Sequence, residues 1–543
     1  MAKRLKAIDL YSGIGGWTLG LKMAGIKIVK SYEWWSVANE THNNNFGTST
    51  PEIDIRKLDL TELPEGINVV VGSPPCTQFS YANRGGSGDI ADGLKDIAKF
   101  LDVVQHYKSK GTLKYWAMEN IPRVSGILEH EIQLGGQLEK YAHLVKENHV
   151  VNCADFGLPQ RRKRMIAGDF PIKNLNSYRN QFIAPTLDQV LSSFKSETVE
   201  DINYSIKLNK KQLTDHEQEL PLTSEERRIN EAQKKYHTVY NKMNFPEDLK
   251  ATSRTMTATC TRVSRESVIV RAGKDDFRRL TIRERATLQG FPITYQFYGN
   301  TYSNRIKMIG NAIPPLLTYF LGSAMLGKAL KEVNPRKDLC YRHPIPQSPH
   351  KPVKAESNAR KYSKTRMFRF SIRPLRFGSG VGYELRNDVQ SKNTSWSIKY
   401  FHGTSKAIKE IYLSKSLLTQ CSKVIRDLNI DFETDASMIH LSTLLKNISG
   451  KNLQNAWTHS EGSDDAQHPF GLLDMLESIS DLIIEKFRDL DRQTLEEFVL
   501  RMHKLDSKGT NGSIKKIKTN AHKIFAGFIL GSWFNTNAKT ISR

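Results

Sequence analysis

Short apolar runs alternate with helix-like stretches over the first 168 residues of this 543-residue chain, and this alternation constrains the fold more than any other feature. Each run is of strand length, and most are followed by apolar residues at helical spacing. The runs are Lys6 to Leu10, Lys27 to Tyr32, Ile67 to Val71, Lys114 to Met118 and Arg164 to Ala167. Strands joined by helices form βαβ units, so the pattern predicts an α/β fold with a doubly wound, mostly parallel sheet.

The composition adds a strong positive charge. There are 80 Lys and Arg against 57 Asp and Glu, a net charge of +23, which favours a polyanion such as nucleic acid as partner. An anionic membrane or a need for solubility would also fit this charge.

No apolar run approaches the ~20 residues that cross a bilayer, so we expect a cytoplasmic protein with no membrane partner. Five scattered cysteines without a CxxC pair exclude a disulfide framework and a zinc finger, and we expect no metal.

Changes in pattern divide the chain into further parts after the sheet domain of residues 1–168. Residues 169–277 are largely polar and poorly amphipathic, as in an inserted module, whereas residues 278–333 return to compact helical sequence that closes the sheet domain. Residues 334–366 are rich in proline and in basic residues, which is typical of a linker. In residues 367–543, strand-like alternation is followed by helical periodicity, so we expect a separate C-terminal α+β accessory domain.

The first candidate binding segment, Asp9 to Gly16, follows the first expected strand and is rich in glycine. Glycine lets the backbone approach a ligand at the carboxyl edge of an open α/β sheet, although the spacing matches neither a dinucleotide fingerprint nor a P-loop. Two later segments, Glu33-Trp34 and Asp54-Ile55, add carboxylates and an indole suited to ribose and a purine. Each carboxylate alone could be a helix cap. Together they favour a ligand with an adenosine and a charged amino acid end.

Three further segments carry reactive or charged side chains. Cys76 follows Pro74-Pro75 after an apolar strand, a stiff and exposed position that favours a nucleophile over a core cysteine. Glu119 follows another apolar strand, and Gln160 to Arg164 form a basic cluster before the next. Taken singly, each segment has an alternative explanation. The Cys76 segment could be a stiff loop, Glu119 could be a helix cap, and the basic cluster could be a solvated face. Together they indicate a site that activates an aromatic ring.

The ordered segments of residues 5–330 resemble the motifs of the DNA (cytosine-5) methyltransferase family. The matching segments are DLYSGIGG, EW, DI, SPPCTQFS, MENI, QRRKR, RRLTIRERATLQGFP and IGNAIPP. The resemblance implies a sheet domain that binds S-adenosylmethionine and a small target-recognition domain in the interruption after Asp169. It also implies methyl transfer to carbon 5 of a cytosine flipped out of double-stranded DNA. Such enzymes of bacteria and phages work in DNA modification, with a restriction endonuclease as a further candidate partner and with a location at the nucleoid.

The resemblance also implies roles for individual residues. Cys76 would attack carbon 6 of the ring, and Glu119 would hold ring nitrogen 3 and the exocyclic amine. Arg162 and Arg164 would contact the 2-oxygen and position the catalytic loop. The residues that match cofactor-binding positions are Tyr11, Gly13, Gly16, Glu33, Trp34, Asp54, Ile55, Pro75 and Asn311.

Two other functions fit parts of the sequence. A transfer RNA cytosine-5 methyltransferase could use the same scaffold, although the Cys-Phe-Thr element typical of that branch is absent. A catalytically silent DNA-binding module is the second alternative, and intact Cys76 and Glu119 argue against it. Residues 331–543 lie outside the resemblance. Their basic linker could follow the DNA backbone, or the C-terminal part could stabilise or dimerise the protein.

Overall fold

The computed structural model describes residues 4–80, 88–213, 219–339, 361–389, 394–404, 407–427, 436–460, 467–488, 491–505 and 512–538. The chain forms two compact units, and each is described by itself. Unit 1 consists of Met1–Leu222 and Pro246–Glu356, and unit 2 consists of Thr223–Phe245 and Ser357–Arg543.

Unit 1 is built on a six-stranded sheet with the strand order β2-β1-β3-β4-β7-β5. The strands are β1 (Lys6–Leu10), β2 (Lys27–Tyr32), β3 (Val69–Gly72), β4 (Tyr115–Asn120), β5 (Glu147–Asn152) and β7 (Lys163–Asp169). The first four strands pair in parallel, whereas β7 is antiparallel to both of its neighbours. The predicted mostly parallel sheet is therefore confirmed. The strand order changes direction between β1 and β3, which is where open α/β sheets bind ligands.

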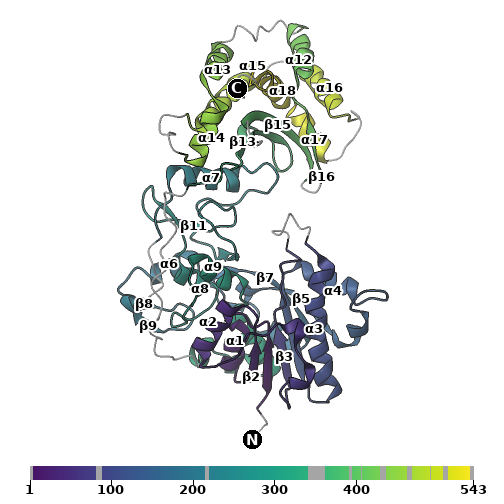
Figure 1. The fold of residues 1–543 in the computed structure, drawn as a ribbon, viewed down its shortest axis with the longest axis vertical. Coiled ribbons are helices and arrows are strands. Elements are labelled where there is room, and N and C mark those ends of the chain that lie inside the picture. The colour runs from purple at the N-terminus through teal and green to yellow at the C-terminus, as the bar shows by residue number, and fades with distance from the viewer. Residues whose placement is uncertain are drawn as a thin grey trace. The chain divides into compact units, whose positions relative to one another are not determined.

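Helices cover both faces of this sheet (Figure 1). The helices α1 (Gly16–Ala24), α2 (Ser36–Phe46) and α10 (Pro315–Met325) pack on one face, and α3 (Ile90–Ser109) and α4 (Arg123–Glu131) pack on the other. Successive strand side chains point to opposite faces, so Ala7 joins the first core and its neighbour Ile8 joins the second. The carboxyl ends of the strands are thus held at one edge by two buried cores.

The remaining elements of unit 1 are short. They are β6 (Gln160–Arg161), α5 (Ile172–Ser177), α6 (Leu187–Ser193), β8 (Thr198–Glu200), β9 (Lys207–Asn209), β10 (Ser253–Arg254), β11 (Ile269–Arg271), β12 (Phe277–Arg279), α8 (Ile282–Leu288), α9 (Tyr302–Asn311) and α11 (Pro335–Asp338). A third small core, with Val190, Val268 and Leu280 among its members, holds many of them together.

The interruption expected as one module, residues 169–277, is divided between the two units. Its middle part, which contains α7 (Ser224–Lys235) and continues to Phe245, folds with unit 2. The sequence of α7, SEERRINEAQKK, has few apolar residues that could reveal its partner. Contacts with residues more than one hundred positions away hold this segment in unit 2, because the few apolar residues of α7 do not specify a partner by themselves.

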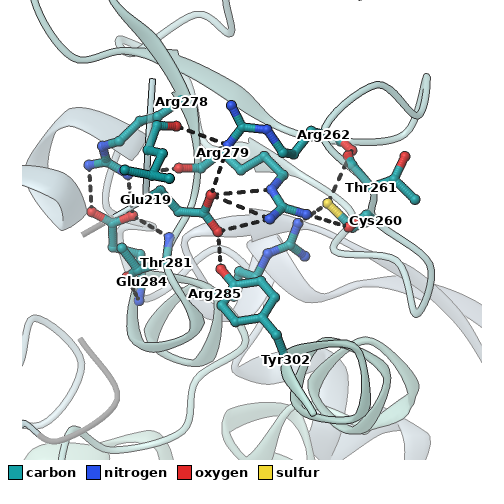
Figure 2. A network of polar contacts seen from close by, with 12 residues as sticks. Glu219, Cys260, Thr261, Arg262, Arg278, Arg279, Thr281, Glu284, Arg285 and Tyr302 are labelled. Carbon is teal, nitrogen blue, oxygen red and sulfur yellow. Dashed lines mark hydrogen bonds and ion pairs between the residues drawn. The ribbon is translucent and has the colours of Figure 1, made fainter. Parts of the chain in front are cut away.

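A buried polar network holds the chain where it leaves unit 1 (Figure 2). Its members include Glu219, Cys260, Arg262, Arg279, Arg285 and Tyr302. The Glu219 carboxylate lies 3.1 Å from Arg279 and accepts a hydrogen bond from the Tyr302 hydroxyl, while Arg262 donates to the carbonyls of Leu220 and Pro221. Residues 219–221 are therefore fixed firmly in unit 1 immediately before the chain enters unit 2.

Unit 2 contains a four-stranded antiparallel sheet, in the order β13-β14-β15-β16, with helices packed on one face (Figure 1). Its elements after α7 are β13 (Arg369–Arg376), β14 (Gly382–Val389), β15 (Thr394–Thr404), β16 (Ala407–Ile411), α12 (Lys415–Asp427), α13 (Ala436–Asn447), α14 (Gly450–Thr458), α15 (Pro469–Lys486), α16 (Arg492–Met502), α17 (Gly512–Thr519) and α18 (Ala521–Asn537). The Tyr383 hydroxyl of β14 donates to the Ile524 carbonyl, 2.6 Å away, and fixes α18 on the sheet. The expected α+β architecture of the C-terminal part is confirmed.

Both described ends of the expected linker, residues 334–366, take part in folded structure. In unit 1, the Tyr319 hydroxyl donates to the Asp338 carboxylate of α11 at 2.5 Å. In unit 2, the Arg366 guanidinium lies 3.5 Å from the ring centroids of Tyr362 and of Trp457. Proline and charge made these ends resemble a linker, but distant partners order them. Residues 340–360 lie outside the described residues.

Candidate active site

The glycine-rich segment after β1 adopts a tight turn at the carboxyl edge of the sheet. Tyr11 and Gly13 have φ values of 53° and 54°, in the left-handed region that glycine occupies easily and tyrosine does not. The Tyr11 hydroxyl donates to Asp96 of α3 at 3.2 Å, which offsets part of this backbone cost. Gly16 serves a different purpose, because a Cβ at this position would lie only 2.1 Å from the Ile313 carbonyl oxygen. The turn therefore lies close to the segment before α10.

Glu33, just after β2, holds this turn in place. Its carboxylate accepts backbone N–H groups from Gly13 at 2.7 Å, Trp34 at 3.0 Å and Trp35 at 2.8 Å. Burial raises the pKa of Glu33, although these three N–H donors act in the opposite direction. The neighbouring Trp34 side chain is 59% exposed and offers an indole face to a ligand.

The turn that carries Cys76 follows β3 and is fastened on two sides. The indole N–H of Trp17 donates to Ser73 Oγ at 3.0 Å, and the side-chain amide of Asn120 donates to the Pro74 carbonyl at 3.0 Å. Cys76 is a free, half-buried thiol. Burial raises its pKa, and the charge of Glu119 raises it further. The charges of Arg164 and Arg162 act in the opposite direction, but burial and Glu119 outweigh them.

Glu119 and Arg164 form an ion pair at the ends of β4 and β7. The Nε atom of Arg164 lies 2.8 Å from Oε1 of Glu119, and their side chains are only 11% and 6% exposed. The pairing of these strands, which sets Glu119 opposite Ile166, brings the two side chains together. A nearly buried carboxylate is thereby held by an ion pair next to the thiol.

Arg162 is buried and binds backbone rather than a carboxylate. Its Nη groups donate to the carbonyls of Met256 at 2.9 Å, Gly310 at 2.8 Å and Ala312 at 3.1 Å. Burial, together with the charge of Arg164, lowers its pKa to about 9. Within the described residues its buried Nε has no hydrogen-bond partner. Arg162 thus binds two distant segments, at Met256 and at Gly310 to Ala312, beside Cys76, a role that the sequence did not show.

These segments surround one cavity of about 200 Å³. It is lined by Tyr11, Gly13, Glu33, Trp34, Pro75, Cys76, Glu119, Arg162, Arg164 and Asn311, among others. Asp54 and Ile55 line an adjoining cavity that shares Tyr11, Trp34 and Pro75 with the first. Gly16 does not line this cavity, but it packs against Ile313, which lines it. The structure therefore brings together all the site residues expected from the sequence.

Several lining residues were missed from the sequence. Asn120 could have been found, because a polar residue ends the apolar strand β4 beside Glu119. Trp17 gave no such signal, since an aromatic residue at helical spacing usually belongs to a core. Lys307 of α9 gave no signal either, because a single lysine in a helix is usually solvated, and yet it lines the cavity and lies 4.7 Å from the centroid of the Trp35 ring.

The two adjoining cavities can accommodate an elongated ligand with an aromatic end. The exposed indole of Trp34 and the side chains of Asp54 and Ile55 suit a purine and its ribose, while the polar turn from Tyr11 to Gly13 suits a charged end. Among the described residues there is no group of three or more His, Cys, Asp or Glu side chains that could hold a metal ion. No helix within the described residues is both long and apolar enough to span a membrane.

Comparison with known proteins gives consistent matches over the first three fifths of the chain. The family model of C-5 cytosine-specific DNA methylases matches residues 5–327. Type II methyltransferase M.HgiDI of Herpetosiphon aurantiacus is 29% identical over 332 residues, which cover 59% of this chain and 94% of that relative. Type II methyltransferase M.HindV of Haemophilus influenzae is 30% identical over 331 residues, with 59% and 96% covered. The solved S. pombe Dnmt2 methyltransferase matches 60% of this chain and 99% of its own, with 19% identity and a TM-score of 0.42.

Proposed function

The chain belongs to the C-5 cytosine-specific DNA methylase family, and from this premise we propose that it methylates carbon 5 of cytosine in double-stranded DNA. S-adenosylmethionine is the proposed methyl donor. The observation that carries the proposal is the grouping of Cys76, Glu119 and Arg164 around one cavity that opens towards Tyr11, Glu33 and Trp34. A nucleophile, an acid and an adjoining space for a methyl donor are the parts that this reaction requires.

The proposed reaction begins with Cys76, because carbon 5 of cytosine is too weak a nucleophile by itself. The Cys76 thiolate adds to carbon 6, a C–S bond forms, and the ring electrons move towards carbon 5 and nitrogen 3. Glu119 stabilises this change by hydrogen bonding to ring nitrogen 3 and the exocyclic amine, and Arg164 fixes Glu119 in position. After carbon 5 has gained the methyl group, it loses its proton to a base, and the C–S bond breaks.

The residues present fit the proposed donor. Glu33 and Trp34 would hold its ribose and adenine, Asp54 and Ile55 would border the adenine, and Tyr11, Gly13, Pro75 and Asn311 would enclose the remainder. When bound, S-adenosylmethionine supplies an electrophilic methyl group. We further propose, from the type II names of the relatives, that the enzyme acts on cellular DNA alongside a cognate restriction endonuclease.

The direct experiment supplies labelled S-adenosylmethionine and either plasmid DNA or total tRNA, and then analyses the nucleosides by mass spectrometry. We expect 5-methylcytosine in the plasmid and none in the tRNA. Label in the tRNA alone would identify the RNA-modifying alternative. Absence of label from both would support a silent DNA-binding module. Bisulfite sequencing of the modified plasmid then identifies the target sequence.

The covalent step is tested with a duplex that carries 5-fluorocytosine at this target. The fluorine cannot leave as a proton does, so the thioether to the enzyme should persist through denaturing electrophoresis. We expect Cys76→Ala to abolish both turnover and this adduct while S-adenosylmethionine binding stays within a few-fold of wild type. A matched variant, Cys421→Ala, removes a buried thiol in unit 2 and should still form the adduct.

A further inference from the structure

Unit 2 lies outside the family match, and its sequence is strongly basic. Residues 357–543 contain 29 Lys and Arg against 19 Asp and Glu. The family model ends at residue 327, so the match does not explain this domain. Its contacts do indicate how it is tied to the enzyme and which surface it offers.

A partly buried cluster of charged side chains around Glu225, here called the Glu225 clasp, fixes α7 in unit 2. Both Nη atoms of Arg366 lie 3.0 Å from Oε1 of Glu225, the second residue of α7. On the other carboxylate oxygen, His459 Nε2 is at 2.7 Å and His468 Nε2 is at 3.1 Å. The chain thus leaves unit 1 in the middle of the expected recognition region, docks in unit 2 and then returns.

After α7 the inserted segment lies along the hairpin of β13 and β14. The hydroxyls of Thr238 and Ser371 are 2.6 Å apart, and the Gly380 amide donates to the Thr238 carbonyl at 2.8 Å. The Arg376 guanidinium donates to the His237 carbonyl at 2.8 Å. One end of the sheet face opposite the helices is therefore built jointly by the insertion and the C-terminal sequence.

The centre of this sheet face holds two arginines on one carboxylate. Arg369 and Arg386 are directly opposite each other in the β13–β14 register, and like charges in this position repel. Both donate through Nε to the same Oε2 atom of Glu384, at 2.7 Å and 2.9 Å. The Glu384 side chain is only 3% exposed, whereas those of Arg369 and Arg386 are 43% and 23% exposed.

The outer ends of the two guanidiniums are available. Among the described residues, the Nη groups of Arg369 and Arg386 donate no hydrogen bond, because both arginines bind Glu384 through Nε. Arg386 is held further by the Phe401 ring, whose centroid lies 4.4 Å from its guanidinium carbon. Lys399, opposite Glu384 on β15, adds a third cation but is paired with Glu410 at 3.0 Å. One carboxylate therefore orients two guanidiniums and compensates only one of their charges.

We propose that this sheet face, centred on Arg369 and Arg386, binds the phosphate backbone of the duplex DNA that carries the target cytosine. Preoriented guanidiniums with free Nη groups match phosphate oxygens in geometry and charge. The insertion connects this face covalently to the enzyme through the anchored residues 219–221. The inference rests on the proposed DNA substrate and adds unit 2 to the DNA-binding surface.

The test measures the dissociation constant of a long duplex with full-length protein at several salt concentrations. Each phosphate contact contributes about 0.9 to the slope of log K against log salt, so R369Q/R386Q should weaken binding and reduce the slope by roughly 2. Glutamine can still donate to Glu384, which favours retention of the fold. The matched control is R488Q/R492Q, which removes two exposed arginines of the same unit that already have acidic partners. Its slope should stay at the wild-type value.

A second variant keeps both arginines. Ser397 is directly opposite Arg386 on β15, so Ser397→Asp places a carboxylate beside the guanidinium and should also reduce the slope. Unchanged salt slopes in both variants would overturn the proposal, and so would a control variant whose slope falls by the same amount. An effect seen with RNA but not with DNA would also overturn it. If wild-type protein methylates plasmid DNA and the variants bind like wild type, only the role of this face is wrong. If wild type methylates no DNA, the proposed function itself is wrong.

Discussion

At the scale of single residues, the chemistry of the site depends on how Cys76 becomes a thiolate. Burial and the neighbouring Glu119 raise its pKa, and the positive charge of Arg164 is already engaged by Glu119. The free enzyme therefore holds Cys76 mainly as a thiol at neutral pH. An approaching ring that hydrogen bonds to Glu119 would change this balance, so thiol activation belongs to the complex with substrate.

This leads to a prediction for the pH dependence of Cys76 alkylation in the free enzyme. Only the thiolate reacts, and a raised pKa leaves less thiolate at neutral pH than an ordinary cysteine has. The alkylation rate constant should therefore keep increasing as the pH passes the usual thiol value of 9.0. Peptide mass spectrometry measures the modification site by site. A plateau near neutral pH would contradict the raised pKa.

A second residue-scale prediction concerns Glu119→Gln. The amide keeps the size of the side chain but loses the charge that pairs with Arg164, and it cannot act as an acid. We expect the methylation rate to fall on the order of 10²-fold or more, the size of a positioned acid–base effect. S-adenosylmethionine affinity, measured by calorimetry, should change little. A rate near wild type would exclude Glu119 from the ring-binding role.

At the scale of elements, the site depends on how closely α1 approaches α10. A Cβ at Gly16 would lie 2.1 Å from the Ile313 carbonyl, and a Cβ at Gly20 would lie 2.4 Å from the Pro315 carbonyl. Glycine at these positions lets the two segments touch although about 300 residues separate them. Because Ile313 also lines the cavity, this packing sets the shape of the proposed donor pocket.

We therefore predict that Gly16→Ala destabilises unit 1 by about 2 kcal/mol, since backbone must move to admit the methyl group. It should also weaken S-adenosylmethionine binding. Gly126→Ala in α4 is the matched control, because its Cβ would meet nothing within 4 Å and alanine favours a helix by up to about 1 kcal/mol. Thermal unfolding and calorimetry measure both variants. Equal behaviour of the two would show that the close approach does not matter.

At the scale of the whole molecule, the chain does not divide at one point into a catalytic part and an accessory part. It passes from unit 1 to unit 2 and back before it enters unit 2 for the last time. The Glu225 clasp makes this arrangement testable, since Glu225 and its partners are far apart in sequence. Burial raises the pKa of Glu225, but hydrogen bonds from His468 and His459 and the charge of Arg366 outweigh it and lower the pKa to about 2.

The pKa of Glu225 is lower in the folded protein than in the unfolded chain. Its carboxylate therefore stabilises the fold at pH values above the unfolded pKa, and this stabilisation is lost as the pH falls through the folded pKa. Between the usual value of 4.5 and about 2, unit 2 should therefore lose about 3 kcal/mol of stability. Glu225→Gln should remove this pH dependence and increase hydrogen exchange in α14 and α15. The control Glu231→Gln affects only a partly exposed pair with Lys235 on the same helix and should change little.

The sequence indicated the parts of the site that depend on contiguous residues. Cys76 between prolines and a polar turn, Glu119 after an apolar strand and the glycines after Asp9 each follow a strand directly, so local pattern was enough to select them. Asn120 and Lys307 were missed because their importance comes from the Pro74 carbonyl and the Trp35 ring, which are distant in sequence. The roles of the selected residues remain predictions that the experiments above address.

By itself, then, the sequence determined the mostly parallel sheet and the residues at its carboxyl edge, because strand periodicity and turn residues act over a few positions. Only the tertiary structure decided that Arg162 binds three backbone carbonyls, that α7 folds with the C-terminal sequence, and that Arg369 and Arg386 share Glu384. These features arise because buried charged and polar groups require hydrogen bonds or ion pairs. Which groups pair depends on how segments far apart in the chain pack together.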